Sequence, residues 1–249
     1  MEQRTQAGIT CHDACFITEE SRTPFCLENL NVSLLRGFVY GVAGPSGAGK
    51  SFFLHVLATG QPPSSGMVRY DGEFFWEDET KWRSHIACVY PEPNFPIRKS
   101  PAKLEKWISV FQPGFDHVFF QEVLKRLHVP HTKSFSAMSA GTMKKGLLAL
   151  ALARRPDFLF LDSVTDGVDP IAREEILDLI REFMQNPRHM TVFATQSLED
   201  LERIADYLLI FQAGKLRAAD EKDALKKRVI ASSGSVPSLE DIIQQLQEE

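Results

Sequence analysis

The sequence predicts an α/β protein whose strands form a largely parallel sheet. Helix-like and strand-like runs alternate regularly from residue 139 to residue 211, which is typical of βαβ units. A glycine-rich turn at residues 44–51 lies between an apolar strand and a helix. The opening region, residues 9–34, is rich in strand-forming sequence and adds strands before this turn.

The first half of the chain is predicted to be mostly strand, with one helix. After the glycine-rich turn, SFFLHVLAT reads as a helix over residues 51–59. The turn residues of GQPPSSG, at 60–66, separate this helix from the next strand. The expected strands are residues 9–16, 25–34, 38–43, the stretch from the turn to about Phe75, and 86–90.

The second half is predicted to be helical at first and then alternating. Residues 101–128 carry apolar side chains at helical spacing. A helix that starts at Ser139 is expected to end at Arg154, because Pro156 follows. The remaining elements are expected as strand 157–162, helix 171–184, strand 190–195, helix 197–205 and strand 207–211.

The C-terminal tail is predicted to be a linker followed by an amphipathic helix. SSGSVPS, at 232–238, has the composition of a linker. We therefore expect one large domain at residues 1–230 and a separate tail at residues 231–249. Four apolar residues of the tail fall on one helix face, at Leu239, Ile242, Ile243 and Leu246.

Composition and charge argue against several classes of function. The 249 residues carry a net charge of −5, with a pI near 5.8, which argues against nucleic acid as the main partner. The longest apolar stretches fall far short of the roughly 20 residues of a membrane span. The first ten residues lack the apolar core of a signal peptide. Four cysteines without zinc-site or disulfide spacing fit a cytosolic protein, so any membrane role is expected to come through a partner.

The glycine-rich turn predicts a nucleotide-binding site. GPSGAGKS matches G-x-x-x-x-G-K-[ST] in full, after an apolar strand and at the start of a helix. Lys50 is expected to reach the β- and γ-phosphates of ATP, and the Ser51 hydroxyl to ligate Mg²⁺. Asp162 ends a buried strand, which is how a carboxylate reaches such a metal ion. The loop residues are Gly44, Pro45, Ser46, Gly47, Ala48, Gly49, Lys50 and Ser51.

Three further stretches of the sequence indicate a protein family. Residues 138–142 open a helix about 20 residues before the strand that ends in Asp162, residues 166–169 follow that strand, and residues 191–196 end the next strand. With GPSGAGKS, their order and spacing resemble the ATP-binding subunits of ABC transporters, from about Ile9 to Ala219. Within that family the chain looks most similar to cytoplasmic ATPase subunits of exporter-type transporters.

The resemblance implies a fold and a set of roles. The fold is a P-loop NTPase core of the ABC ATPase type with a parallel sheet, an N-terminal antiparallel β subdomain and a helical signature subdomain at about 98–142. Asp162 becomes the Walker B aspartate, and Phe16 the aromatic that stacks on adenine, with an ordinary core position as the alternative. Met138, Ser139, Ala140, Gly141 and Thr142 become the signature that binds ATP on a partner subunit, and Asp166, Gly167, Val168 and Asp169 the D-loop at the dimer interface.

The chain departs from the family pattern at the catalytic positions. Ser163 stands where the family has the glutamate that polarises the attacking water, and Gln196 where it has the switch histidine. The γ-phosphate-sensing glutamine falls on Pro91 or Glu92, depending on register. The signature also has Ala140 and Thr142 in place of glycine and glutamine. A serine hydroxyl is too weakly basic to accept a proton at neutral pH, so hydrolysis at this site is expected to be very slow.

The resulting hypothesis is a subunit that holds Mg-ATP, pairs with a second ATP-binding subunit, and lies at the inner face of the membrane through a permease. The permease is expected to dock near residues 91–115, at a groove that Phe95, Pro96, Ile97, Trp107 and Phe111 line. One alternative is a weakly active homodimeric ATPase that uses Glu92. The other is a nucleotide-dependent regulator without a permease.

Overall fold

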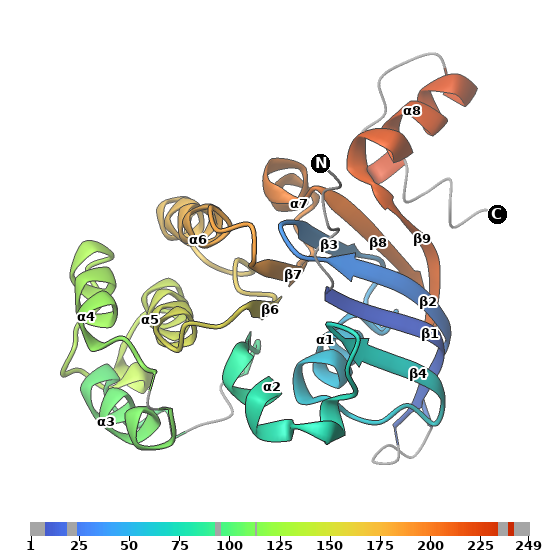
Figure 1. Cartoon of the computed structure of the whole chain (residues 1–249). Coiled ribbons are helices and arrows are strands. Elements are labelled where there is room, and N and C mark those ends of the chain that lie inside the picture. The colour runs from blue at the N-terminus through green and yellow to red at the C-terminus, as the bar shows by residue number, and fades with distance from the viewer. Residues whose placement is uncertain (1–7, 19–23, 93–95, 113, 234–238, 242–249) are drawn as a thin grey trace, which may run out of the picture.

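The computed structural model describes residues 8–18, 24–92, 96–112, 114–233 and 239–241. The strands are β1 (Gly8–Ile17), β2 (Cys26–Leu35), β3 (Val39–Ala43), β4 (Ser65–Tyr70), β5 (Ile86–Val89), β6 (Phe158–Asp162), β7 (Met190–Ala194), β8 (Tyr207–Gln212) and β9 (Lys215–Glu221). These nine strands form one sheet in the order β4-β1-β2-β9-β8-β3-β7-β6-β5 (Figure 1). From β8 to β5 neighbours pair in parallel, whereas β1 pairs antiparallel with β2 and β4. The predicted parallel core and N-terminal antiparallel part are confirmed.

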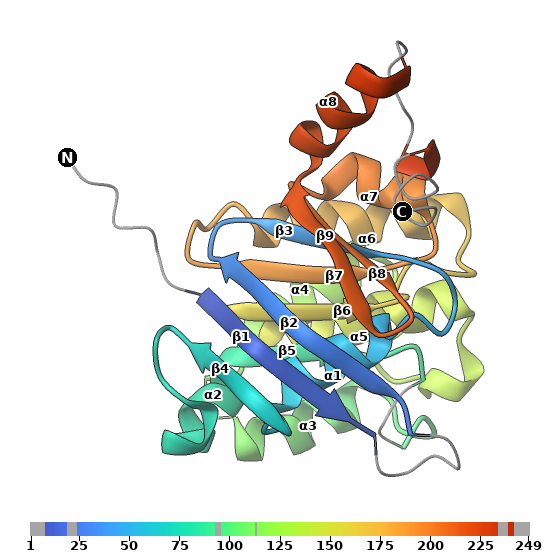
Figure 2. The same ribbon diagram turned by 90° about the vertical axis from the view of Figure 1, so that its right-hand side faces the viewer.

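Figure 2 shows the antiparallel strands β1, β2 and β4 side by side at one end of the sheet.

The helices are α1 (Lys50–Thr59), α2 (Glu79–His85), α3 (Pro101–Phe111), α4 (His117–Arg126), α5 (Ala140–Ala153), α6 (Pro170–Phe183), α7 (Leu198–Ile204) and α8 (Lys222–Ser233).

Two apolar cores lie on the two faces of the sheet, and β6 contributes to both. Phe158 and Phe160 join one core with α1 and the antiparallel strands. Leu159 and Leu161 join the other core with α5, α6 and α7. Successive side chains of a strand point to opposite faces of the sheet. A strand that is covered on both faces therefore needs apolar side chains at every position, as in residues 158–161. The last residue of the strand, Asp162, is the point where this buried strand reaches the site.

The predicted helical region lies beyond the β5 edge of the sheet. Helices α3 and α4 lie beside α5 (Figure 1). Helix α3 ends at Phe111 and α4 begins at His117. Leu104, Phe115 and Phe120 belong to the same apolar core as the buried side chains of α5. Asp116 caps α4 by accepting a hydrogen bond from the N–H of Phe119 at 2.8 Å. These helices place α5, whose amino end carries the signature residues, beside the site.

Several elements differ from those predicted. The strand after the first turn ends at Tyr70, and the short helix α2 follows. Strand β9 and helix α8 were not expected, and α8 runs across the predicted domain boundary at residue 230. Leu239 is buried against the core, at 4% exposed. The other three residues of the predicted tail helix, Ile242, Ile243 and Leu246, lie outside the described residues.

Candidate nucleotide-binding site

The glycine-rich loop connects β3 to α1 and leaves the amino end of α1 open. Gly44 has a φ of 141°, and a Cβ there would lie 2.2 Å from the carbonyl oxygen of Phe211. Gly49 is the N-cap of α1 with a φ of 105°, and it offers no side chain to the first N–H groups of the helix. Those groups, together with the positive end of the helix dipole, are a ready site for an anion.

Lys50 places its ammonium group over this loop. Its Nζ donates hydrogen bonds to the carbonyl oxygens of Gly44 at 2.7 Å and Pro45 at 2.9 Å. Partial burial lowers the pKa of Lys50, while the carboxylates of Asp162 and Asp166 act in the opposite direction. The loop therefore holds a cation at the position where the motif expects the β- and γ-phosphates.

The loop opens into a cavity of about 1,050 Å³, large enough for a nucleotide. Gly44 and Pro45 do not line it, and Ala48 is buried at 2% exposed. The predicted site residues that do line it are Ser46, Gly47, Gly49, Lys50, Ser51, Asp162, Ser163 and Gln196. The structure thus brings residues of the glycine-rich loop, Asp162, Ser163 and Gln196 to one cavity.

Asp162 and Ser51 carry oxygen atoms of the kinds that bind a magnesium ion. Asp162 is 3% exposed and accepts a hydrogen bond from the Ser163 hydroxyl at 3.2 Å. A carboxylate and a hydroxyl are the ligand types that Mg²⁺ prefers, with water and phosphate oxygens completing its octahedron. In the described part of the chain no group of three or more His, Cys, Asp or Glu side chains forms an all-protein metal site. The residues therefore fit Mg²⁺ bound together with a nucleotide.

Ser163 has a tightly held backbone and lies beside Asp162 and Asp166. Its φ is 54°, and its N–H donates to the carbonyl oxygen of Ala194 at 2.8 Å. Its own carbonyl oxygen accepts from Lys144 Nζ at 2.8 Å. Asp162 is the single carboxylate among the described residues that line the cavity. Glu92 is exposed and outside that lining.

The structure corrects the prediction for Phe16. Its ring is 1% exposed and belongs to the core that contains α1. The next residue, Ile17, points to the other face of β1, is 45% exposed and lines the cavity. Phe25 also lines the cavity, with its ring in an edge-to-face contact with Phe52. Ile17 and Phe25, and not Phe16, are thus among the apolar side chains that line the cavity.

The signature residues lie at the amino end of α5, outside the cavity. Ser139 caps α5 by accepting from the N–H of Thr142 at 3.2 Å. Gly141 is buried, and a Cβ there would lie 2.9 Å from Cβ of Ala172. Ser139 and Ala140 are exposed, while Met138 packs partly against the core.

The predicted D-loop connects β6 to α6. Asp166 accepts a hydrogen bond from the Thr195 hydroxyl at 2.8 Å, and Gly167 has a φ of 69°. Asp169 caps α6 by accepting from the N–H of Ala172 at 2.9 Å, and Val168 packs against the core. A salt bridge joins Arg173 of this helix to the fully buried Asp200 of α7. The loop is therefore fixed at both ends.

Some residues around the cavity were not predicted from the sequence. His55 lies one turn after Ser51 on α1 and lines the cavity, and the i, i+4 spacing is the signal that could have found it. Its Nδ1 lies 3.4 Å from the hydroxyl oxygen of Tyr90. Thr18, Gln61, Pro62 and Ser64 also line the cavity, from loops without a sequence motif.

The loop, the open helix end and the Asp162 carboxylate define a P-loop nucleotide-binding protein. The family model described as ABC transporter matches residues 27–166, which is more than half of the chain. The chain belongs to the ATP-binding proteins of ABC transporters.

Relatives and solved structures agree with this family. The chain is 25% identical over 204 residues to the ABC transporter ATP-binding protein YtrB of Bacillus subtilis (strain 168), covering 82% of this chain and 70% of that protein. It is 30% identical over 209 residues to the bacitracin transport ATP-binding protein BcrA of Bacillus licheniformis, covering 81% and 67%. A solved ATP-binding subunit of an ABC transporter superposes with a TM-score of 0.81 at 18% identity, over 96% of this chain and 99% of that one.

Proposed function

We propose that this chain binds Mg-ATP at a site that hydrolyses it very slowly. The observation that carries the proposal is the lining of the cavity, where Asp162 is the single described carboxylate and Ser163 stands beside it. Phosphoryl transfer depends on positioning and charge stabilisation, with a residue that orients the attacking water. Loss of a general base costs on the order of 10²–10⁴ in rate. Lys50, Ser51 and Asp162 remain in place to hold the nucleotide and its metal.

We propose further that the chain acts in a dimer with a second ATP-binding subunit that keeps its catalytic residues. Ser139 and Ala140 are exposed at the amino end of α5, away from the chain's own cavity. The exposed amino end of a helix that does not face its own nucleotide is suited to an anion held by another subunit. This supports a division of labour in which one subunit holds ATP and the other hydrolyses it.

The membrane partner in this proposal is a separate permease of the exporter type, which keeps the subunit at the inner face of the membrane. In the described residues no helix is long and apolar enough to cross a bilayer. Trp107, Val110 and Phe111 of α3 are 47%, 71% and 82% exposed, and exposed apolar patches mark interaction sites. Pro96, Trp107 and Phe111 line a cavity at this surface. Ile97 is 40% exposed outside that lining, and Phe95 lies outside the described residues.

The test compares binding with turnover. The purified chain is expected to bind a fluorescent ATP analogue in the presence of Mg²⁺ and to release almost no phosphate. Phosphate release should appear when a homologous subunit with an intact catalytic glutamate is added. Turnover of order 1 s⁻¹ by the isolated chain, a typical enzymatic rate, would refute the proposal. So would equal turnover after that partner's glutamate is replaced by glutamine.

A further inference from the structure

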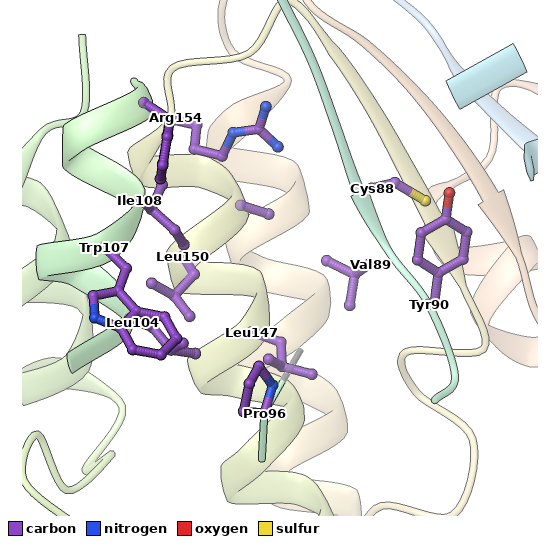
Figure 3. A pocket seen from close by; sticks show the side chains of 12 residues that line it. Cys88, Val89, Tyr90, Pro96, Leu104, Trp107, Ile108, Leu147, Leu150 and Arg154 are labelled. Atoms are coloured by element: carbon purple, nitrogen blue, oxygen red, sulfur yellow. The ribbon is translucent and has the colours of Figure 1, made fainter. Parts of the chain in front are cut away.

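Two further cavities lie apart from the nucleotide cavity. One lies between α3, α5 and the end of β5, where Leu104, Trp107 and Arg154 are among the lining side chains (Figure 3), and it belongs to the surface proposed for the permease. The other, which we call the α5–α6 cavity, lies where α4 and the carboxyl ends of α5 and α6 meet the loop before β7. Its volume of about 550 Å³ is within the roughly 300–1,000 Å³ of small-molecule sites.

The α5–α6 cavity follows from the way these two helices pack. Near their amino ends the helices touch, because a Cβ on Gly141 of α5 would lie 2.9 Å from Cβ of Ala172 of α6. Near their carboxyl ends, Leu152 of α5 and Leu179 of α6 both line the cavity. The cavity is therefore walled by helices that belong to the core of the chain, and such elements hold a site more precisely than loops do.

The inner wall of the cavity is apolar and partly aromatic. Leu152, Pro156 and Leu179 are buried and form its aliphatic part. Phe119 of α4 and Phe183 of α6 add two aromatic rings, and both pack against the core that contains the two leucines. Apolar and aromatic walls of this kind are typical of ligand pockets.

The acidic and basic side chains that line the cavity are already paired. Arg155 forms a salt bridge with Asp116, and its guanidinium lies 4.8 Å from the ring centroid of Phe119. Glu182 accepts two hydrogen bonds from Arg126, at 3.1 and 3.0 Å. A charged ligand would leave water and find no free counter-ion among the described residues that line the cavity, which is costly. The lining therefore favours an uncharged ligand.

His189 adds an aromatic surface without a charge at neutral pH. Its ring stacks on that of Phe183, with the centroids 4.0 Å apart and the planes at 12°. Its Nδ1 donates to the carbonyl oxygen of Phe183 at 2.7 Å, which leaves Nε2 to accept from the amide of Asn186 at 3.1 Å. Burial lowers the pKa of His189, and the hydrogen bond to Phe183 opposes this effect.

Gln185 offers the polar group that a ligand can use. Its side chain is exposed at the rim of the cavity, and its amide forms no hydrogen bond with a described residue. A primary amide has one acceptor oxygen and two N–H donors. It therefore matches a ligand in which an N–H group stands beside a carbonyl group.

We infer that the α5–α6 cavity binds an uncharged, planar heteroaromatic compound whose ring lies against Phe119 and Phe183 and whose adjacent N–H and C=O groups bond to Gln185. Aromatic walls favour a planar ring because stacked and edge-to-face contacts add to the buried area, and a rigid ring loses little conformational freedom on binding. The inference goes beyond the proposed function and is independent of it, because this cavity shares no lining residue with the other two.

The first test uses uncharged bicyclic lactams as probes, namely quinolin-2-one, isoquinolin-1-one and quinazolin-4-one. Each is titrated onto the full chain with isotope-labelled leucine methyl groups, and binding is followed by NMR. The methyl signals of Leu152 and Leu179 are expected to shift with a Kd below about 1 mM for at least one lactam. Leu27 and Leu54, which lie in the other core, should not shift. Absence of a shift at Leu152 and Leu179 with all three lactams would overturn the inference.

The second test addresses the class of ligand. Quinoline-4-carboxylate carries a negative charge and 4-(aminomethyl)quinoline a positive one, on a ring of the same shape. Both are expected to bind at least about tenfold more weakly than the best lactam, because neither finds a free counter-ion. Octahydroquinolin-2-one keeps the lactam but is not planar, and it should also bind more weakly. Binding of any of these three as tight as that of the best lactam would overturn the inference.

Variants then test the contacts. Gln185→Ala should weaken lactam binding about two- to tenfold, the range for one hydrogen bond, and should leave the affinity for quinoline, which lacks the N–H and C=O pair, unchanged. Gln121→Ala is the matched control, since this glutamine of α4 is outside the cavity lining. Leu179→Phe fills the cavity and should abolish the shift of the Leu152 signals, with melting temperature and ATP binding measured to confirm the fold. Because Gln185 is exposed, its replacement tests the inference without disturbing the core, and unchanged lactam affinity in Gln185→Ala would overturn it.

Discussion

Replacing Ser163 with glutamate should convert the proposed ATP-holding site into a hydrolytic one. The backbone at residue 163 is already held by three hydrogen bonds: its N–H donates to Ala194, and its carbonyl oxygen accepts from Lys144 and from the N–H of Asp166. The residue already has a φ of 54°, so the substitution adds no left-handed strain that is not present in the native chain. The new carboxylate would therefore enter the cavity beside Asp162 without a rearrangement of the loop.

The expected gain follows from the role of a general base. Such a base contributes about 10²–10⁴ in rate, which corresponds to roughly 2.7–5.5 kcal/mol at 1.36 kcal/mol per tenfold. Gln196 still stands at the family's histidine position and lines the cavity. We therefore expect Ser163→Glu alone to raise turnover by about 10², at the lower end of that range. Adding Gln196→His should raise turnover further.

The assay is steady-state phosphate release at saturating Mg-ATP, with the subunit paired to a homologue whose own catalytic glutamate is replaced by glutamine. Ser163→Gln is the matched control, because it has nearly the same size but cannot accept a proton. Equal rates for the glutamate and glutamine variants would refute the role assigned to residue 163. A wild-type rate already near 1 s⁻¹ would refute the premise.

Three further predictions test other parts of the site and fold. Lys50→Met should weaken ATP binding at least about tenfold, since it removes a charged donor to phosphate; unchanged affinity in a fluorescence titration would contradict this. Glu92→Gln should leave residual phosphate release unchanged, because Glu92 lies outside the cavity lining, and a loss of turnover would contradict this. Burial raises the pKa of Glu105, but hydrogen bonds from His117, His131 and Gln121 outweigh it and lower that pKa. The ionised Glu105 carboxylate therefore stabilises the fold above the unfolded-state pKa of glutamate, near 4.3, and this stabilisation is lost as the pH falls through the lower pKa of the folded state. Melting temperature should consequently fall less steeply between pH 5 and pH 3 in Glu105→Gln than in the wild type.

The parallel core could be predicted because its strands are buried on both faces. β6 is FLFLD, a short apolar run that ends in a carboxylate. Such a run is typical of a parallel strand that is covered on both faces. β9 escaped prediction because its sequence, KLRAADE, shows little apolar alternation. It forms through a tight turn at Ala213 and Gly214, with φ values of 47° and 80°, and pairs antiparallel with β8. Helix α2 was not predicted because it is a short, charged segment. Its contact with the core is made by Trp82, which is 1% exposed.

Side-chain direction limited the prediction of the site. The loop motif fixes Lys50 and Ser51 because their roles depend on backbone geometry that the motif itself specifies. The face of the sheet to which Phe16 points depends on the pleat and the bulges of β1. A shift of one residue along the strand places Ile17, instead of Phe16, against the nucleotide cavity. The surroundings of Arg154 could not be predicted, because they come from α3, β5 and the carbonyl of Arg83, which are distant in the sequence.

Lys144 connects position 163 and the predicted D-loop to helix α5. It lies on α5, two positions after Thr142 of the signature, and donates to the carbonyl oxygens of both Ser163 and Asp166. These hydrogen bonds tie both segments to the helix whose amino end carries Ser139. These contacts use carbonyl oxygens, which any residue at position 163 would supply. Under the proposed function, the side chain at position 163 therefore lacks a base, while the contacts of its backbone with α5 remain.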